Sequence, residues 1–552
     1  SGIDVAKAFD SVSQDSIFAV CQANGISEAD LALLRSMYRS CETFLKVGGI
    51  CSRRIQIRRG VKQGCPLSPI LFNLVIDQLL RSLEQLGLGV RIENRLLCSL
   101  GFADDLVLIG ANNRQVEELA QHASQFYGKV SLAINAKKTT LSGTDEPISI
   151  GNEVITPDVA FKYLGTMIDP SNDSRFKPSR ISYKLLCIER SERPAGQKLY
   201  FIRQHLIPEL IHRLVHEKSL DSQLREIDER IRSAVKRILG LSHRTPTSFF
   251  YLSHKNGGLA LPQLRYDVPR ISIRRMVRLK ASNSWFVRAI TRTKWFHTEV
   301  SRVNRLCPAE NDNQKRLLND MAKIERGHPY FLIGGNKLLN KHLSGTTDLP
   351  EEKFLKLVQV RAGMMVAEDE WCFHCNKQKN MMHILNGCTY AVNKADQTLR
   401  HDRILDAIMT CLGDQGLKLY RTPRIYFTEH DYLIPDLLLV SKIANVAFCL
   451  DVGVSYELAG SLDAYDQVKR RKYSAIKDHI IAWLHHQGEE HVTDLKTHGL
   501  IFGSKGSIHN VCLNLLADVF SIPYSSIEDM LIGCVLDSHA MILKYRSWNP
   551  PS

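Results

Sequence analysis

Three acidic residues in the first part of the chain have the types and positions of a metal-binding catalytic site. Asp104 and Asp105 lie side by side between apolar segments, which predicts a tight hairpin, and Asp4 ends another strand-like segment. Carboxylates flanked by buried strands repel each other and lose hydration, so they favour a bound cation. Three of them suit Mg²⁺, and two such ions can activate a 3′-hydroxyl and stabilise a leaving pyrophosphate. An Asp-rich surface turn is the structural alternative for Asp104 and Asp105 taken alone.

A second set of ligands is a short cysteine and histidine cluster with the spacing C-x2-C-x7-H-x4-C: Cys372, Cys375, His383 and Cys388. Three thiolates and one imidazole suit tetrahedral Zn²⁺, and a complete ligand set predicts a structural site. His374 is an alternative ligand, but its position next to Cys375 would require a strained geometry. The other cysteines are scattered, which indicates a reducing compartment rather than a disulfide framework. Coincidence among fourteen cysteines and twenty histidines is the alternative.

A second pair of carboxylates lies near the C-terminal end. Asp436 follows Pro435 at the start of one predicted strand, and Asp451 lies within the next. Two carboxylates on neighbouring strands can share a metal that activates water for attack on a phosphodiester. A lysine nearby would orient that water or stabilise the phosphorane, and Lys469 and Lys472, followed by Tyr473, lie on the next predicted helix. Pro-Asp taken alone is more often an edge-strand turn, and the run 469–472 is also typical of a nuclear-localisation or phosphate-binding patch.

The elements that must position these residues follow from hydrophobic periodicity. Apolar runs at 96–102, 106–109 and 148–150 alternate with an amphipathic helical pattern over 70–86, which predicts a mixed sheet with packed helices. From 179 to 241 the pattern is helical. Strands are predicted at 433–440, 446–454 and near 500–502, with a basic helix from about Asp463 between the last two.

Length and composition limit the class of protein. The 552 residues are 44% hydrophobic and 24% charged, with a net charge of +14, so collagen-like, disordered and low-complexity classes are excluded. This length suggests about three to five domains, and no apolar run reaches the roughly 18 residues that span a membrane. Because the chain begins with Ser-Gly-Ile-Asp rather than Met, we expect a fragment that lacks an N-terminal part.

Part of the positive charge is concentrated between residues 265 and 294, with aromatic residues interleaved: Tyr266, Trp285 and Trp295. Long cationic side chains beside flat rings suit a phosphate backbone with unstacked bases. A solvated helix face is the alternative.

Several motifs in order over residues 1–170 resemble the palm of a reverse transcriptase of the non-LTR retrotransposon type. They are Asp4 with Phe9, the Gly/Pro-rich segment 59–73 that opens a helix, the pair Asp104 and Asp105, the segment 135–139, and Phe161-Lys162-Tyr163-Leu164-Gly165. The resemblance implies that Asp4, Asp104 and Asp105 bind Mg²⁺. It also implies that the fingers, which lie upstream in that family, are missing from this chain.

The same resemblance gives roles to four other residues. Phe9 matches the bulky gate that excludes a ribose 2′-hydroxyl, with a core aromatic residue as the alternative. Gln63 and Gly64 match a loop that contacts the incoming nucleotide and template. Lys138 matches a lysine that can protonate pyrophosphate, with a solvated lysine as the alternative.

The C-terminal residues resemble the restriction-like endonuclease of site-specific non-LTR elements, the group that inserts into arthropod large-subunit ribosomal RNA genes. The resemblance rests on Pro-Asp436, Asp451 and Lys469-x2-Lys472-Tyr473, all after the Cys/His cluster and Arg400-His401-Asp402. One departure is that Gly453 stands where the common restriction-enzyme pattern has its lysine. Glu457 is a further acid that we leave out of the predicted ligands.

Together these resemblances imply an α/β multidomain fold. We expect a partial reverse-transcriptase palm over 1–175, a helical thumb over 176–265, a basic nucleic-acid-binding linker over 266–370, a zinc knuckle over 371–404 and a restriction-like endonuclease over 405–552. The implied activity is RNA-directed DNA polymerase coupled to a DNA endonuclease in target-primed reverse transcription. The implied partners are element RNA, deoxynucleoside triphosphates and double-stranded target DNA, with ribosomal DNA expected, in the nucleus and without a membrane.

Three other functions stay open at this point. One is an intron-maturase-like protein, although the His- and Asn-rich nuclease that often ends such proteins is not visible. The second is a domesticated protein that acts mainly by RNA binding, although the five predicted catalytic aspartates are intact. The third is an element whose nuclease lies upstream and whose C-terminal part merely binds.

Overall fold

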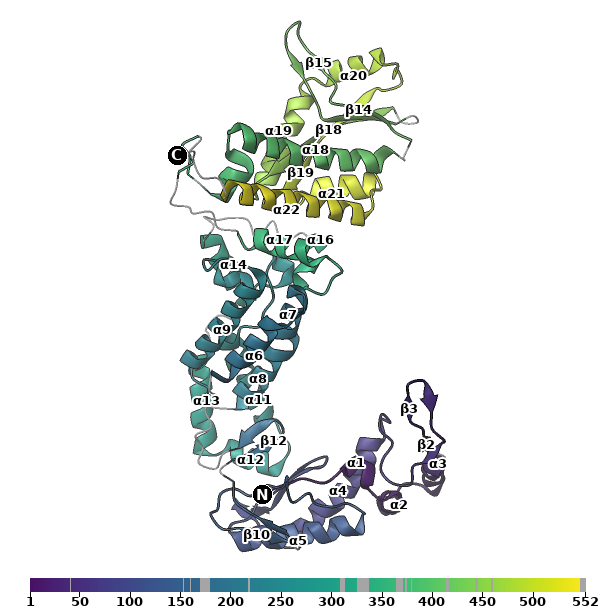
Figure 1. The fold of residues 1–552 in the computed structure, drawn as a ribbon, viewed down its shortest axis with the longest axis vertical. Helices are drawn as coiled ribbons and strands as arrows, with labels where there is room; N and C mark the ends of the chain where they lie inside the picture. The colour runs from purple at the N-terminus through teal and green to yellow at the C-terminus, as the bar shows by residue number, and fades with distance from the viewer. Residues whose placement is uncertain are drawn as a thin grey trace. The chain divides into compact units, whose positions relative to one another are not determined.

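The structure is a computed structural model that describes residues 1–39, 41–151, 153–158, 160–168, 179–216, 219–307, 313–324, 337–363, 371–372, 375–378, 380–413, 416–441, 445–457 and 460–546. The chain forms two compact units. The first comprises residues 1–176, 213–219 and 269–306, and the second comprises 177–212, 220–268 and 307–552. Helices and strands occur in both (Figure 1), which confirms the α/β class.

The first unit is built on a three-stranded antiparallel sheet in the order β1–β9–β8. Strands β8 (Ser99–Phe102) and β9 (Asp105–Leu108) form a hairpin, and β1 (Gly2–Ile3) pairs with β9 so that Ile3 is opposite Leu106. Helices α4 (Ser68–Gln85) and α5 (Asn113–Lys129) pack on it. The predicted strands and the predicted helix over 70–86 are confirmed. The sheet is antiparallel rather than mixed, and the strand at 148–150 pairs with 153–155 in a separate two-stranded sheet.

Local sequence explains both helices. The buried residues of α4 recur at helical spacing, at 71, 72, 75, 76, 79 and 83, and Pro69 occupies its first turn, where a missing N–H costs nothing. Helix α5 begins at Asn112, whose side chain accepts a hydrogen bond from the backbone of Gln115.

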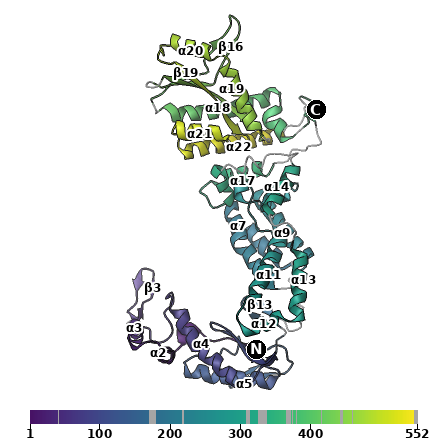
Figure 2. The ribbon, with the colours of Figure 1, turned by 180° about the vertical axis from the view of Figure 1, so that it is seen from behind.

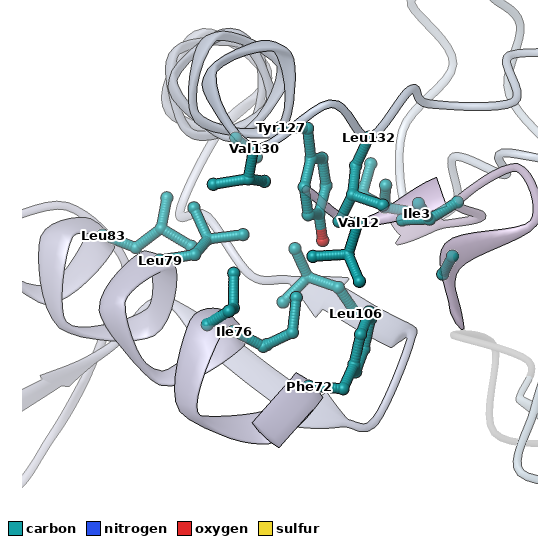
Figure 3. Packing of buried hydrophobic residues seen from close by; sticks show 14 of the residues in the cluster. Ile3, Val12, Phe72, Ile76, Leu79, Leu83, Leu106, Tyr127, Val130 and Leu132 are labelled. Carbon is teal, nitrogen blue, oxygen red and sulfur yellow. The ribbon is translucent and has the colours of Figure 1, made fainter. Parts of the chain in front are cut away.

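The core of this unit lies between the sheet and the two helices. Figure 3 shows Leu79 and Leu83 of α4 facing Tyr127 and Val130, with Leu106 of the central strand beneath them. These side chains are 8% exposed or less. Burial of each large apolar side chain contributes about 1.5–3 kcal/mol, so the core fixes the strand that carries Asp105.

Further short elements complete the first unit: α1 (Ala8–Ser11), α2 (Gln14–Ala23), α3 (Glu28–Arg39), β2 (Glu42–Thr43), β3 (Lys46–Val47), β4 (Ile50–Cys51), β5 (Ile55–Gln56), β6 (Val90–Ile92), β7 (Arg95–Leu97), β10 (Ile148–Ile150), β11 (Glu153–Ile155), β12 (Phe161–Tyr163), β13 (Thr166–Ile168), α12 (Trp285–Thr291) and α13 (Lys294–Leu306). Helix α11 (Leu264–Lys280) contributes its residues from 269 onward. Most of the basic stretch 265–294 therefore belongs to this unit.

Helices dominate the earlier part of the second unit, as predicted for 179–241: α6 (Ser179–Arg190), α7 (Ala195–Phe201), α8 (Ile207–His216), α9 (Asp221–Leu239), α10 (Thr247–Tyr251), α14 (Asn313–Ile324), α16 (Lys337–Asn340) and α17 (Glu351–Arg361). Helix α8 contributes its residues up to 212 to this unit, and its residues from 213 onward belong to the first unit. A π-helical turn at Ile202–Leu206 joins α7 to α8, and 3₁₀ turns occur at His254–Asn256 and Lys341–Ser344. Helix α7 lies beside α9 in both views (Figures 1 and 2).

A four-stranded sheet forms the centre of the C-terminal region, in the order β14–β17–β18–β19. It consists of β14 (Lys418–Arg421), β17 (Leu437–Val440), β18 (Val446–Ser455) and β19 (Asp494–Gly503). Only the β18–β19 pair is parallel, and two helices connect these strands, as a parallel connection requires: α19 (Ser461–Ser474) and α20 (Lys477–His486).

Two separate cores cover the faces of this sheet. Leu437, Leu439 and Leu450 pack with α18 (Ala391–Gly413) and α22 (Tyr524–Arg546). Leu438 and Cys449 point to the other face and pack with residues of α19 and α20. The period-2 alternation along each strand explains this division.

The other short elements of this region are the hairpin β15 (Ile425–Tyr426) and β16 (Tyr432–Leu433), α21 (Asn510–Asn514), and π-helical turns at His383–Gly387 and Leu515–Val519. Helix α18 runs continuously through position 404, where a domain boundary was predicted. The predicted linker 266–370 falls across both compact units. The domain ranges therefore stay predictions. Among the described helices, none is both long and apolar enough to span a bilayer.

Candidate active sites and metal centre

The hairpin between β8 and β9 positions the two adjacent aspartates of the first unit. Phe102 pairs with Asp105, so Ala103 and Asp104 form a two-residue turn, and Ala103 has a φ of 53°. Asp4 directly follows β1, which pairs with β9, so Asp4 and Asp105 lie at adjoining strand ends. Burial first, and then the charges of Asp104 and Asp4, raises the pKa of Asp105. The structure therefore brings the three carboxylates into one electrostatic site.

A returning segment of chain holds the backbone of Asp4. The Asp4 amide donates to Thr139 Oγ1 at 3.3 Å, and its carbonyl accepts from the Asn135 amide at 2.8 Å. Lys138 lies in the same turn, with its amide donating to the Asn135 carbonyl at 3.1 Å and its side chain exposed. The motif at 135–139 is thus tied to the first aspartate.

Two tyrosines also lie in the electrostatic field of this site. Burial and then the charge of Asp104 raise the pKa of Tyr127, and burial and then the charge of Asp105 raise the pKa of Tyr163. Tyr163 belongs to the hairpin of β12 and β13, in the motif at 161–165. No site role was predicted for Tyr127, because in the sequence it is one of several residues on the apolar face of a helix.

Phe9 and Gln63 are brought together by the loop before α4. The Gln63 side-chain amide donates to Asp10 Oδ1 at 2.8 Å, and the Val61 amide donates to the Phe9 carbonyl at 2.7 Å. The loop can approach this closely because residue 60 is glycine: an added Cβ would lie 2.7 Å from the backbone of Asp10. The half-buried Phe9 ring stacks on Phe72, with ring centroids 4.5 Å apart.

Gly64, next to Gln63, has a φ of +85° and no heavy atom within 4 Å of a built Cβ. Its position thus needs the left-handed conformation rather than close packing. This open surface is consistent with a contact to a nucleotide, and the roles of Phe9, Gln63 and Gly64 stay predictions.

The cysteine and histidine cluster forms one compact ligand set. The ligand atoms of Cys372, Cys375, His383 and Cys388 all lie within 4.8 Å of one another. Among the described residues, this is the group of cysteine, histidine and acidic side chains that is placed to hold a metal ion. His374 lies outside the described residues.

The geometry of this cluster fits zinc. The Sγ atoms of Cys372 and Cys388 are 3.9 Å apart, close to the roughly 3.8 Å edge of a tetrahedron with Zn–S bonds of about 2.3 Å. Cys375 Sγ is 3.3 Å from His383 Nε2. Burial raises the pKa of the Cys388 thiol to about 11, so a thiolate there requires a cation. A π-helical turn positions His383, whose amide donates to Asn380 Oδ1 at 2.8 Å.

Of the two acids of the C-terminal sheet, Asp451 is buried and contacts a lysine, and Asp436 is half-buried. Asp436 immediately precedes β17, and Asp451 lies on the adjacent β18, where it is 3% exposed. Lys469 of α19 places Nζ 2.5 Å from Asp451 Oδ2 and 3.2 Å from the Val452 carbonyl. Residues 15 to 33 positions apart thus converge as predicted, while their catalytic roles stay predictions.

The absence of a lysine at position 453 has a steric reason. A Cβ added to Gly453 would meet the Tyr465 ring at 2.5 Å and Ile501 Cδ1 at 3.0 Å. Lys469, one helical turn after Tyr465, instead brings an ammonium group to the acid from the neighbouring helix. A cation–π contact with Tyr465, 5.5 Å to the ring centroid, helps to hold it there.

His401 is a site residue that our sequence reasoning did not assign. Its Nε2 lies 3.1 Å from Asp436 Oδ2, and its Nδ1 lies 3.0 Å from Asp402 Oδ1. The hydrogen bond with Asp436 raises the pKa of His401 to about 9 despite burial, so this side chain is a cation at neutral pH. We grouped it with the Cys/His cluster because it follows that cluster in sequence.

The two acids have opposite electrostatic character. Burial is the largest single effect on Asp436 and opposes its ionisation, but the hydrogen bonds with His401 and Asp451 and the charges of His401 and Lys469 together outweigh it and lower the pKa of that carboxyl. Asp436 Oδ2 also accepts from the Val452 amide at 2.7 Å. Burial and the charge of Asp436 raise the pKa of Asp451. Two carboxylates in hydrogen-bonding contact repel each other when both are ionised, and a divalent cation can relieve that repulsion.

Tyr473 and Lys472 complete the cluster in different ways. The buried Tyr473 hydroxyl bonds to the Ile434 carbonyl at 2.8 Å and to Asp451 Oδ1 at 3.2 Å. The exposed Lys472 contacts the Tyr473 hydroxyl at 2.8 Å rather than an acid. Lys469 is therefore the better candidate for the predicted catalytic lysine.

Glu457, which we left out of the predicted ligands, is fully engaged by a loop. Its carboxylate accepts from the Lys505 amide at 2.7 Å, from Ser507 Oγ at 2.9 Å and from Ser504 Oγ at 3.1 Å. These bonds satisfy a fully buried acid without a metal.

Comparison with known proteins identifies relatives of the chain. Residues 1–168 match the family described as reverse transcriptase (RNA-dependent DNA polymerase). A retrovirus-related Pol polyprotein from the type-1 retrotransposable element R2 of Popillia japonica is 29% identical over 510 residues, which cover 85% of this chain and 69% of the relative. The corresponding R2 protein of Nasonia vitripennis is 26% identical, covering 77% of this chain and 43% of the relative. The Pol polyprotein from the type-2 element R2DM of Drosophila melanogaster is 33% identical, covering 51% of this chain and 28% of its own length.

Proposed function

Since the chain is a relative of the Pol polyproteins of type-1 R2 elements and its residues 1–168 match the reverse transcriptase family, we propose that it couples RNA-directed DNA synthesis to DNA nicking. The family supports the coarser statement, an RNA-directed DNA polymerase of a non-LTR retrotransposon that uses an RNA template and deoxynucleoside triphosphates. The endonuclease and the coupling of the two activities are the proposed additions.

One observation carries the endonuclease. Asp436, Asp451 and Lys469 come from the ends or middle of two adjacent strands and from a helix. Asp451 is in hydrogen-bonding contact with both Lys469 and Asp436, and the charge of Lys469 also acts on Asp436. Mg²⁺ held by the two carboxylates would supply a Lewis acid for hydrolysis of a phosphodiester. His401 holds Asp436 in position, Tyr473 holds Asp451, and the Lys469 ammonium is placed to stabilise negative charge on the phosphate.

In the proposed sequence of steps, the C-terminal site nicks one strand of chromosomal DNA in the nucleus. The freed 3′-hydroxyl then primes copying of element RNA at the carboxylates Asp4, Asp104 and Asp105, which would bind Mg²⁺. Zn²⁺ on the four Cys/His ligands would hold the intervening segment, and ribosomal DNA is the proposed target.

The test is nicking of supercoiled plasmid by the chain in Mg²⁺, comparing the parent with Asp436→Ala and Lys469→Ala. Asp104→Ala is the matched control, because it removes an acid from the other site. We expect both C-terminal substitutions to abolish nicking, while Asp104→Ala nicks like the parent and zinc content is the same in all four proteins.

Equal nicking by all variants would overturn the endonuclease assignment and point to a contaminant. Absence of nicking in every variant, with primed RNA copying retained by all but Asp104→Ala, would leave a polymerase whose C-terminal part merely binds nucleic acid.

A further inference from the structure

A surface hollow of about 730 Å³ lies in the helical part of the second unit, where no role has been given to any residue so far. Its walls are α6 on one side and, on the other, the continuous stretch of α7, the π-helical turn at 202–206 and the start of α8. Helices α6 and α7 can be followed in Figure 1.

The floor of the hollow is unusually aromatic for a surface. Tyr183, Tyr200 and Phe201 are 73%, 40% and 49% exposed, and the His205 ring stacks on Phe201 with centroids 5.0 Å apart at 29°. Scattered apolar residues on a surface need no explanation, but several flat rings gathered in one concavity indicate a binding site.

The backbone beneath the rings has a special geometry. The Ile207 amide donates to the Ile202 carbonyl five residues back, which widens the helix by one residue just before Pro208, which has no N–H to donate. Such π-helical turns are rare and occur often at functional sites. Phe201 immediately precedes this turn and His205 lies within it, so the turn sets the arrangement of the stacked rings.

The rim carries more positive than negative charge. Lys184, Arg193 and Lys198 line the hollow together with a single acid, Glu209. Glu209 holds Lys184 in place with contacts of 2.6 Å, and Lys198 Nζ donates to the Glu189 carbonyl at 2.9 Å. Flat rings with cations beside them match the stacked bases and phosphates of an unpaired strand.

We propose that this hollow binds an unpaired stretch of single-stranded RNA, with bases stacked on Tyr200 and Phe201 and phosphates beside Lys184 and Arg193. The tyrosine hydroxyls and the Gln197 amide on its walls are partners for a ribose 2′-hydroxyl, which favours RNA over DNA. The inference rests on the proposed function only in that the polymerase has an RNA template to bind.

A second hollow of about 350 Å³ indicates on which side of the rings the RNA backbone lies. It shares Gln197 and Tyr200 with the first but is lined by Asp348 and Glu351. These carboxylates repel phosphates, so the RNA backbone runs along the Lys184 side, and Tyr200 lies at the boundary between the two hollows.

The experiment measures binding of the full chain to a fluorescein-labelled 12-nucleotide RNA of A and U without secondary structure, in EDTA so that no catalysis occurs. We expect the double substitution Tyr200→Ala and Phe201→Ala to raise Kd about tenfold or more, since stacking contributes that much per base. Tyr200→Phe keeps the ring and binds within about threefold of the parent.

Matched controls separate stacking from general loss of structure. Tyr524→Ala removes a tyrosine of α22 that is 54% exposed, slightly more than either substituted ring of the hollow, and should leave Kd unchanged. A fully paired RNA duplex binds the double variant as tightly as it binds the parent. RNA carrying 4-thiouridine crosslinks, on irradiation, to the peptide that contains residues 200 and 201.

Three results would overturn the proposal: parent-like RNA binding by the double variant, an equal loss of duplex binding, or a single-stranded DNA of the same sequence that binds the parent more tightly than RNA. Copying of a primed template is measured separately in Mg²⁺. If this chain does not copy RNA but its RNA binding still depends on the two rings, the RNA site stands and the polymerase activity of this chain alone does not.

Discussion

The two acidic sites of this protein balance their charge in opposite ways. The C-terminal site neutralises Asp451 and Asp436 with its own Lys469 and His401, and Asp451 is 3% exposed. In the first unit, the described residues place no ion pair on Asp4, Asp104 or Asp105, and all three are at least partly exposed. The C-terminal carboxylates are therefore part of what holds the fold together, whereas those of the first unit depend on a cation or a substrate to balance their charge.

The largest expected effect tests whether the two sites are chemically independent. Asp104→Asn removes one of the three carboxylates that would hold Mg²⁺, and the metal supplies the positive charge that stabilises the transition state, so primed RNA copying should fall by about 10³-fold or more, equivalent to about 4 kcal/mol. Asp451→Asn should do the same to nicking. Each activity is measured in both variants, and the comparison fails if either substitution reduces both activities alike.

The next largest effect is on stability, because removing a lysine should destabilise the protein at the C-terminal site but not at the first site. Lys469→Met leaves buried Asp451 without its cation, so we expect a loss of about 3 kcal/mol in the free energy of unfolding, measured by urea denaturation in EDTA at pH 7. Lys138→Met, at an exposed lysine beside the first site, should change it by less than about 0.5 kcal/mol. Similar losses in the two variants would show that the C-terminal cluster is not an integral part of the folded structure.

Asp228 is a buried carboxylate that accepts hydrogen bonds from backbone amides and has no lysine in contact among the described residues, so it shows how burial changes the pKa of an acid. Asp228 of α9 accepts from the Leu264 and Arg265 amides at 2.9 and 3.1 Å, and burial raises its pKa from 3.8 to about 6. A raised pKa means that the folded state binds this proton more tightly. The associated stability is present below about pH 4 and is lost as the pH rises through 6, by about 3 kcal/mol.

Asp228→Asn should remove that dependence. The difference in unfolding free energy between variant and parent is measured by urea denaturation at intervals from pH 4 to pH 7, and it should move in favour of the variant as the pH rises. A difference that stays constant over this range would mean that Asp228 titrates normally in the folded protein.

The smallest expected effects concern single hydrogen bonds. Tyr473→Phe removes a buried hydroxyl that contacts Asp451 and the Ile434 carbonyl, and should lower the free energy of unfolding by about 1–2 kcal/mol.

Gln63→Ala breaks an exposed hydrogen bond to Asp10 and should change the free energy of unfolding by less than about 0.5 kcal/mol while raising the KM for deoxynucleotides. Thermal unfolding and nucleotide titration measure these effects. If Gln63→Ala lowered the free energy of unfolding by more than Tyr473→Phe does, the contrast between the two sites would be wrong.

The sequence alone determined the features that depend on short separations. The two-residue turn at Ala103 and Asp104 follows from acids between two apolar runs, and the compact Cys/His ligand set spans only residues 372–388. Helix α4 follows from its apolar spacing and Pro69. In each case a local pattern of hydrophobicity or of ligand spacing is compatible with few backbone conformations, so the sequence predicts the structure.

Only the tertiary structure decided which distant groups meet. His401 is 35 residues before Asp436 and reaches it because α18 packs on the sheet. Lys469 takes the place of a lysine at position 453 because Tyr465 and Ile501 fill the space there. The aromatic hollow needs two helices and a π-helical turn to form. Sequence patterns report which face of one element is buried, but contact between two elements depends on how their surfaces fit, and that is settled only when the chain packs.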